Sequence, residues 1–104
     1  MTRDEAAEAI VAELRKPGGG GDVTLLDVQH YTGMLGIVVP EMDYPSQKLV
    51  IRDLTERVGD LLETRGMHRR SLALTVFTLG QARGMWLNFG STFEDHLPPR
   101  WWAE

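Results

Sequence analysis

The chain of 104 residues contains no cysteine. Disulfide bonds, thiolate metal sites and cysteine nucleophiles are therefore excluded, whereas the redox compartment stays open. No apolar run approaches the length that crosses a bilayer, and the opening residues MTRDEAAEAI lack the basic and apolar regions of a secretory leader. These absences predict a cytoplasmic protein that does not bind membranes.

Basic residues are in the minority, with eleven lysines and arginines against fifteen acids and a net charge of −4. A negative chain repels phosphate backbones unless its basic groups cluster, so nucleic-acid binding is disfavoured. Hydrophobic residues make up 42% of the chain and charged residues 25%, which is ordinary for a globular protein. The length fits a single domain, and the small size and the excess of arginine over lysine suggest a bacterial or phage protein.

Two segments have the pattern of amphipathic helices. The first, TRDEAAEAIVAELRKP, opens with Thr2 and Glu5 at the spacing of a capping box and ends before the glycine run 18–21. The second, YPSQKLVIRDLTERVGDLLETRG, has Ser46 as its predicted N-cap and Gly66 as its stop. The glycine run is interpreted as a linker, because a phosphate-binding loop requires a preceding strand and a following Lys-Ser/Thr that are missing here.

The remaining segments are predicted to form two β-hairpins. The first has strands at 23–30 and 34–39 around a turn at 31–33, and the second has strands at 71–79 and 85–89 around a turn at 80–84. The order helix, hairpin, helix, hairpin predicts an α+β fold, with a four-stranded mainly antiparallel sheet and two helices on one face. Residues 1–97 are expected to form this domain, and residues 98–104 an extended tail.

The predicted strands are apolar on both faces, which raises the question of what covers the second face of the sheet. Strand 71–79 places Leu72, Leu74 and Val76 on one side and Ala73, Phe77 and Leu79 on the other. Two helices cover one face, so the other face needs the tail, a second copy of the chain or a different protein. The tail contains Trp101 and Trp102, and each tryptophan buries roughly 150–250 Å² when it is covered.

Candidate catalytic groups are few. Asp27, His30 and Tyr31 are close in sequence, but Asp27 and His30 point to opposite faces of a strand. The other two histidines, His68 and His96, lack the spacing of a metal site. We therefore predict no enzyme activity, no cofactor and no metal.

One basic cluster follows the second helix and comprises Arg65, His68, Arg69 and Arg70. Cations at this position interact favourably with the negative end of the helix dipole. Contact with an acidic partner or a phosphate is the alternative interpretation.

The stretch VTLLDVQHYTG, residues 23–33, resembles the first helix and turn of the helix-turn-helix in the lactose-repressor family of transcription regulators. The resemblance implies a helix at these residues, with Gly33 in the turn, and DNA binding by a following recognition helix. The residues that follow here, MLGIVVPEM, contain no donor side chain for bases or phosphates. A DNA-binding regulator is the alternative function.

The working hypothesis from sequence is a small acidic protein that binds another protein, inhibiting, adapting or assembling it by covering or bridging a surface. The expected partner is a protein, either a second copy in a homodimer or a different chain. The predicted contact residues are Trp101, Trp102, Trp86, Arg100, Arg69 and Arg70. Aromatic and arginine side chains dominate the binding energy of interfaces, and acidic side chains steer a basic partner.

Overall fold

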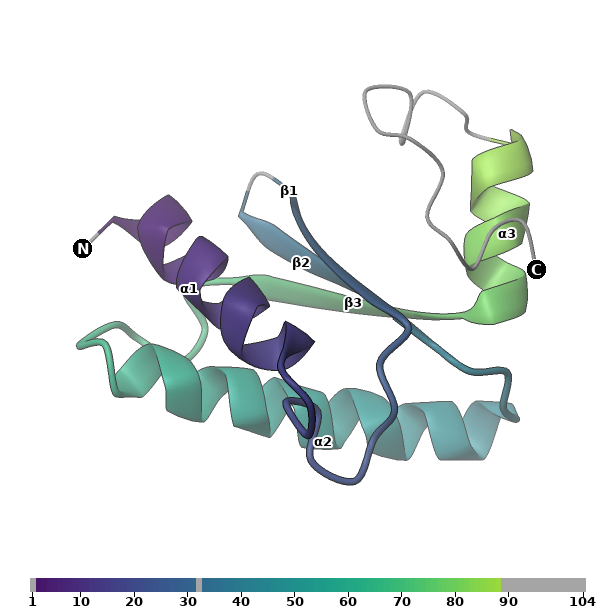
Figure 1. The fold of residues 1–104 in the computed structure, drawn as a ribbon, viewed down its shortest axis with the longest axis horizontal. Helices are drawn as coiled ribbons and strands as arrows, with labels where there is room; N and C mark the ends of the chain where they lie inside the picture. The colour runs from purple at the N-terminus through teal and green to yellow at the C-terminus, as the bar shows by residue number, and fades with distance from the viewer. Residues whose placement is uncertain (1, 32, 89–104) are drawn as a thin grey trace.

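A computed structural model describes residues 2–31 and 33–88 of the chain. Three helices and three strands form a small α+β structure (Figure 1). In chain order they are α1 (Arg3–Arg15), β1 (Asp27–Tyr31), β2 (Met34–Val39), α2 (Tyr44–Glu63), β3 (Ala73–Thr78) and α3 (Leu79–Asn88). The predicted boundary between a domain at 1–97 and a tail at 98–104 lies outside the described residues.

The strands form one mixed sheet with the order β1-β2-β3. β1 and β2 form an antiparallel hairpin, whereas β2 and β3 are parallel and are joined by α2. A parallel pair needs a long crossover connection, which α2 supplies. The predicted four-stranded, mainly antiparallel sheet is therefore wrong.

The first helix begins as its sequence predicts. The Thr2 hydroxyl accepts a hydrogen bond from the Glu5 N–H at 3.1 Å, and the Glu5 carboxylate accepts one from the Thr2 N–H at 3.2 Å. These bonds satisfy two N–H groups that the helix leaves without partners. The predicted capping box is confirmed.

The second helix begins earlier than predicted, because Asp43 and not Ser46 is its N-cap. The Asp43 carboxylate accepts a hydrogen bond from the Ser46 N–H at 2.9 Å, so Ser46 lies inside the first turn. At the other end, Gly66 adopts a φ of 73° and Met67 N–H donates to Leu62 O at 3.1 Å. This arrangement of a left-handed glycine and a backbone bond across the last turn is typical of helix ends and confirms the predicted stop.

The first predicted hairpin is present, although β1 begins at Asp27 and not at residue 23. Gly33, with a φ of 70°, lies in the turn between the two strands. Residues 27–31 are extended, so the helix implied by the resemblance to the lactose-repressor family is not formed there.

The second predicted hairpin is wrong, because residues 79–88 form α3. The Thr78 hydroxyl accepts a hydrogen bond from the Gln81 N–H at 3.3 Å, and the Gln81 side chain accepts one from the Thr78 N–H at 3.0 Å. The sequence TLGQ is thus a capping box that begins a helix directly after β3. Glu41 adds a carboxylate that accepts from the Gly80 N–H at 3.0 Å, at the positive end of α3.

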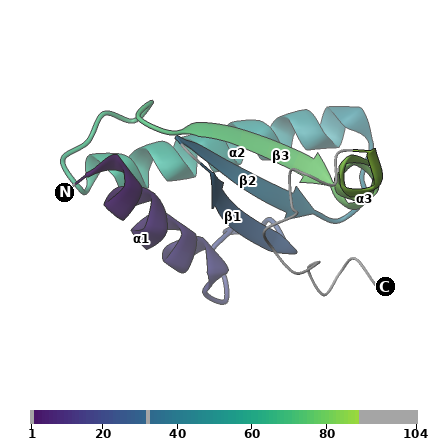
Figure 2. The same cartoon turned by 90° about the horizontal axis from the view of Figure 1, so that it is seen from above.

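The main core lies between the sheet and the two longer helices. Figure 1 shows α2 running beneath the sheet, and Figure 2 shows α1 beside the β1 edge and α3 at the end of β3. The core residues are Ala6, Ala7, Ile10, Val11, Leu14, Val28, Leu35, Ile37, Val39, Leu54, Val58, Leu62, Leu72 and Val76. Both long helices therefore bury their apolar stripes against one face of the sheet.

Candidate functional site

The face of the sheet opposite α1 and α2 is the first candidate site, and we call it the second face. Because side chains alternate along a strand, the residues beside the core positions point to this face. They are Asp27, Gln29 and Tyr31 of β1, Met34, Gly36 and Val38 of β2, and Ala73, Thr75 and Phe77 of β3. The second face is thus polar along β1 and largely apolar along β2 and β3.

A row of hydrogen bonds follows β1 on the second face. The Tyr31 hydroxyl donates to Gln29 Oε1 at 2.7 Å, and Gln29 Nε2 donates to Asp27 Oδ2 at 2.9 Å. Burial and then the nearby negative charge of Asp27 raise the pKa of Tyr31 to about 12. Tyr31 therefore remains a neutral hydrogen-bond donor in this row at physiological pH.

The ring of Tyr31 lies across the central strand. A Cβ added to Gly36, which is opposite Gln29 in the register, would stand 2.8 Å from Tyr31 Cε2. Glycine at this position therefore leaves room for the aromatic ring to approach the backbone of β2. The ring of Tyr31 thus occupies the space in the middle of the second face that a side chain at position 36 would fill.

The C-terminal end of the second face is covered by α3. Val38 is buried and packs in a small cluster with Ala82, Phe77 and Leu79, separate from the main core. Met34, Thr75 and Phe77 remain partly exposed. The second face is therefore closed at one end by α3, and it keeps accessible apolar groups along β2 and β3.

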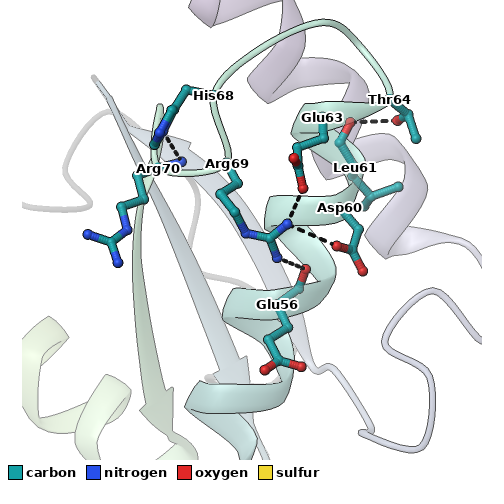
Figure 3. Close-up of polar contacts among 8 residues, drawn as sticks. All are labelled: Glu56, Asp60, Leu61, Glu63, Thr64, His68, Arg69 and Arg70. Atoms are coloured by element: carbon teal, nitrogen blue, oxygen red, sulfur yellow. Dashed lines mark hydrogen bonds and ion pairs between the residues drawn. The ribbon is translucent and has the colours of Figure 1, made fainter.

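Arg69, in the connection between α2 and β3, lies against the last turns of α2 (Figure 3). Its guanidinium contacts the Asp60 carboxylate at 3.2 Å, the Glu63 carboxylate, and the Glu56 carbonyl at 3.4 Å. The hydrogen bond to Asp60 raises the pKa of Arg69, and the charge of Glu63 adds to this effect. The charge of Arg69 is thus matched within its own chain.

Arg70 points away from this group in Figure 3. Its backbone N–H donates to Nδ1 of His68 at 3.1 Å, and its side chain is exposed. Of the predicted contact arginines, Arg69 and Arg70 belong to the described residues; Arg69 is paired with Asp60 and Glu63, whereas Arg70 presents its guanidinium to solvent. Arg65 donates to Leu61 O at 2.9 Å, as expected for a cation at a helix end.

The remaining predicted contact residues are not brought together by the described structure. Trp86 belongs to α3, and β3 separates this helix from Arg69 and Arg70. Trp101, Trp102 and Arg100 lie outside the described residues.

The predicted separation of Asp27 and His30 is confirmed. Asp27 belongs to the hydrogen-bonded row on the second face, whereas His30 faces α1, with Nδ1 at 3.1 Å from Glu8 and Nε2 at 3.7 Å from Asp4. Each ring nitrogen thus faces a different carboxylate. Within residues 2–31 and 33–88, no three His, Cys, Asp or Glu side chains are placed to hold a metal ion.

A hollow of about 850 Å³ lies beside the glycine run and is lined by residues 14–28. The N–H groups of Gly19, Gly21 and Val23 donate to backbone carbonyls within this loop, at 2.8, 3.0 and 3.2 Å. Arg57 donates to the Gly19 carbonyl. Because these amides already have partners, they do not form the cradle of free N–H groups that a phosphate requires.

The sequence patterns did not predict the hydrogen-bonded row on β1, or the positions of Gln47 and Gln81, which hydrogen-bond to backbone groups at the edge of β3. The signal available for α3 was the capping box TLGQ.

Among the described helices, none is both long and apolar enough to cross a membrane. Comparison with known proteins finds no matching family, no matching curated protein and no matching solved structure.

Proposed function

We propose that the chain is a small, acidic, non-enzymatic protein that binds a partner protein through the second face of its sheet and covers or bridges a surface of that partner. One observation carries this proposal. Met34 and Phe77 stay partly exposed on the second face, whereas α1 and α2 pack on the other face. When a partner buries apolar surface of this kind, the binding free energy becomes more favourable by about 25 cal/mol per Å².

The chemistry of the second face also favours binding over catalysis. Its polar groups, Asp27, Gln29 and Tyr31, bond to one another in a fixed row. Asp27 and His30, the acid/base pair considered from sequence, are divided by the sheet. A row of fixed donors and acceptors beside an apolar strip provides orientation and burial, the two requirements of a specific interface.

The size of the second face indicates that it acts together with other surface. Three strands of at most six residues span about 20 by 14 Å at standard strand spacings. A stable interface buries roughly 800 Å² on each partner, which is more than this face provides. We propose that Trp86 of α3 and the residues Arg100, Trp101 and Trp102 extend the binding surface, with Arg70 as a charged contact.

A homodimer is the form of this proposal that is tested first. The experiment compares the solution molar mass, by light scattering, of the full chain and of a chain that ends at Leu97. A dimeric full chain and a monomeric shortened chain support a role of the tryptophans in self-association. Equal monomeric masses contradict self-association, and a different protein is then the proposed partner.

The second face is tested with a charge placed at its centre. Thr75→Lys puts a cation on the partly buried strip of β3, and Leu49→Lys is the matched control on the exposed side of α2, where Leu49 is 53% exposed. We expect Thr75→Lys to abolish dimerisation, or binding of the partner that the wild type binds, while Leu49→Lys has no effect. Equal binding by both folded variants would show that the second face is not the interface.

A further inference from the structure

The outer edge of β3 is occupied by side chains where a further strand would pair. β3 has β2 as its partner strand in the described sheet, and the Ala73 N–H donates toward β2, to Gly33 O at 3.0 Å. The backbone N–H and C=O groups of successive residues point to opposite sides of a strand. Those of Leu74, Val76 and Thr78 therefore point away from β2. Such outward N–H and C=O groups are a template for pairing with another chain.

Gln47 of α2 and Gln81 of α3 meet at this edge. Gln47 Nε2 donates to Val76 O at 3.2 Å and to Gln81 Oε1 at 2.8 Å. The same Gln81 oxygen accepts the Thr78 N–H at 3.0 Å. Gln47 is only 6% exposed, and a buried amide is costly unless it is hydrogen-bonded in this way. The two side chains thus satisfy the outward groups of Val76 and Thr78.

The opposite edge of the sheet carries a similar bond. The closing pair of the hairpin, Tyr31 and Met34, places the backbone groups of Val28 on the side away from β2. Nε and Nη2 of Arg15 donate to Val28 O at 3.1 and 2.6 Å. Arg15 belongs to α1, so a helix covers this edge of the sheet at Val28, and covering an edge with another element protects it against edge-to-edge association.

We propose that Gln47 and Gln81 form a plug that prevents two copies of this chain from pairing through β3, and that removing the plug makes this edge a binding site for β3 of a second copy. The two edges are then identical, so the contact is a two-fold antiparallel pairing. A register centred on Thr75 pairs Leu74 of one copy with Val76 of the other through their outward groups. The Val76 carbonyl, which loses the Gln47 donor, gains a backbone donor instead.

The test uses the full chain with Gln47→Ala and Gln81→Ala together. We expect its molar mass by light scattering to rise with concentration to twice the wild-type value. Gln29→Ala, the control, removes a bonded glutamine from the second face and should not raise the mass. Because the chain has no cysteine, Thr75→Cys adds a single thiol. In the proposed register the two Thr75 Cα atoms are about 4.5 Å apart, within disulfide reach.

Oxidation of Thr75→Cys should give a covalent dimer in the plug-free background and at least tenfold less in the background with the plug. A plug-free chain that is folded by circular dichroism, keeps the wild-type mass and forms no such dimer would overturn the proposal. If the double variant does not fold, Gln81→Ala alone is used, since Gln81 is exposed. An unchanged rate of cross-linking in that variant would also overturn it. All tests of the second face keep the plug intact, and the molar mass of the plug-free chain, which carries no change at Thr75, tests the plug by itself, so the two proposals fail separately.

Discussion

The guanidinium of Arg69 lies over Gly59 of α2, where an added Cβ would stand 2.8 Å from Arg69 Nη2. Arg69 reaches this position from the connection after α2 and contacts Asp60 and Glu63 on the next turn. Glycine weakens a helix interior, so a second cause is needed for its presence here. Gly59 leaves the space that the arginine occupies, and this explains its presence. The contacts of Arg69 with α2 then hold the connection between α2 and β3 against the helix.

Gly59→Ala is expected to have different effects with and without Arg69. In an Arg69→Ala background, the substitution should raise the free energy of unfolding by about 1 kcal/mol, because alanine is the better helix former. With Arg69 present the gain should be smaller, since the new methyl group displaces the guanidinium from its ion pairs. Urea unfolding of the four chains of this cycle measures the difference. Equal gains in both backgrounds would show that Gly59 and Arg69 are not coupled.

Tyr31 should ionise late in a spectrophotometric titration. Its pKa is raised to about 12 in the folded chain because of burial and the charge of Asp27. The tyrosinate absorbance of the wild type is expected to contain a component near that pH, and Tyr31→Phe should lack it. A wild-type titration without this late component would contradict the burial of Tyr31 on the second face.

The same shift predicts how stability changes in alkali. The folded pKa of Tyr31 lies above the ordinary value of 10, so the unfolded state loses this proton first. The contribution of Tyr31 to stability is therefore complete below about pH 10 and is lost as the pH rises from there through about 12. Tyr31→Phe should reduce this fall in the free energy of unfolding, and an identical fall in both chains would contradict it.

Sequence patterns predicted the elements whose signals are local. The box of Thr2 and Glu5 and the stop at Gly66 depend on residues within one or two turns, and both are present in the structure. The hairpin of β1 and β2 likewise needs only neighbouring segments and a turn glycine. The order of the elements up to the end of α2 could therefore be predicted from local patterns, although the N-cap of α2 and the start of β1 were not.

The structure after the end of α2 could not be predicted in this way, because contacts between distant elements decide whether residues 79–88 form a strand or a helix. Residues 79–88 are apolar enough for a strand, but the Thr78–Gln81 box and the Glu41 carboxylate favour a helix. Glu41 is far away in sequence and is brought to this position by the crossover through α2. The Gln47–Gln81 contact has the same origin, so no local pattern could have predicted the edge of β3.

Thr78→Val should lower the free energy of unfolding by about 1 kcal/mol, the usual cost of losing an N-cap hydroxyl, by destabilising the start of α3. The substitution keeps the shape of this buried side chain but leaves the Gln81 N–H without its acceptor. Thr75→Val, in the same strand but outside the cap, is the matched control and should cost less. Amide exchange in α3 and urea unfolding measure the effect. Equal destabilisation by the two variants would show that the box does not hold the start of α3.

Asp43 predicts how α2 responds to acid. Hydrogen bonds from the side chain and backbone N–H of Ser46 lower the pKa of this carboxylate below its ordinary value. The unfolded state therefore takes up the proton first as the pH falls, so the stabilisation is complete above about pH 4 and is lost as the pH drops through the lower folded pKa.

Asp43→Asn keeps a capping oxygen that does not ionise. We expect the variant to lose less stability than the wild type between about pH 5 and pH 2, measured by urea unfolding at each pH. Asp53→Asn, in the middle of α2, is the control for the removal of one acid from this helix. If the two variants change the acid dependence equally, net charge rather than the cap is responsible, and Asp43 does not stabilise α2 through its ionised form.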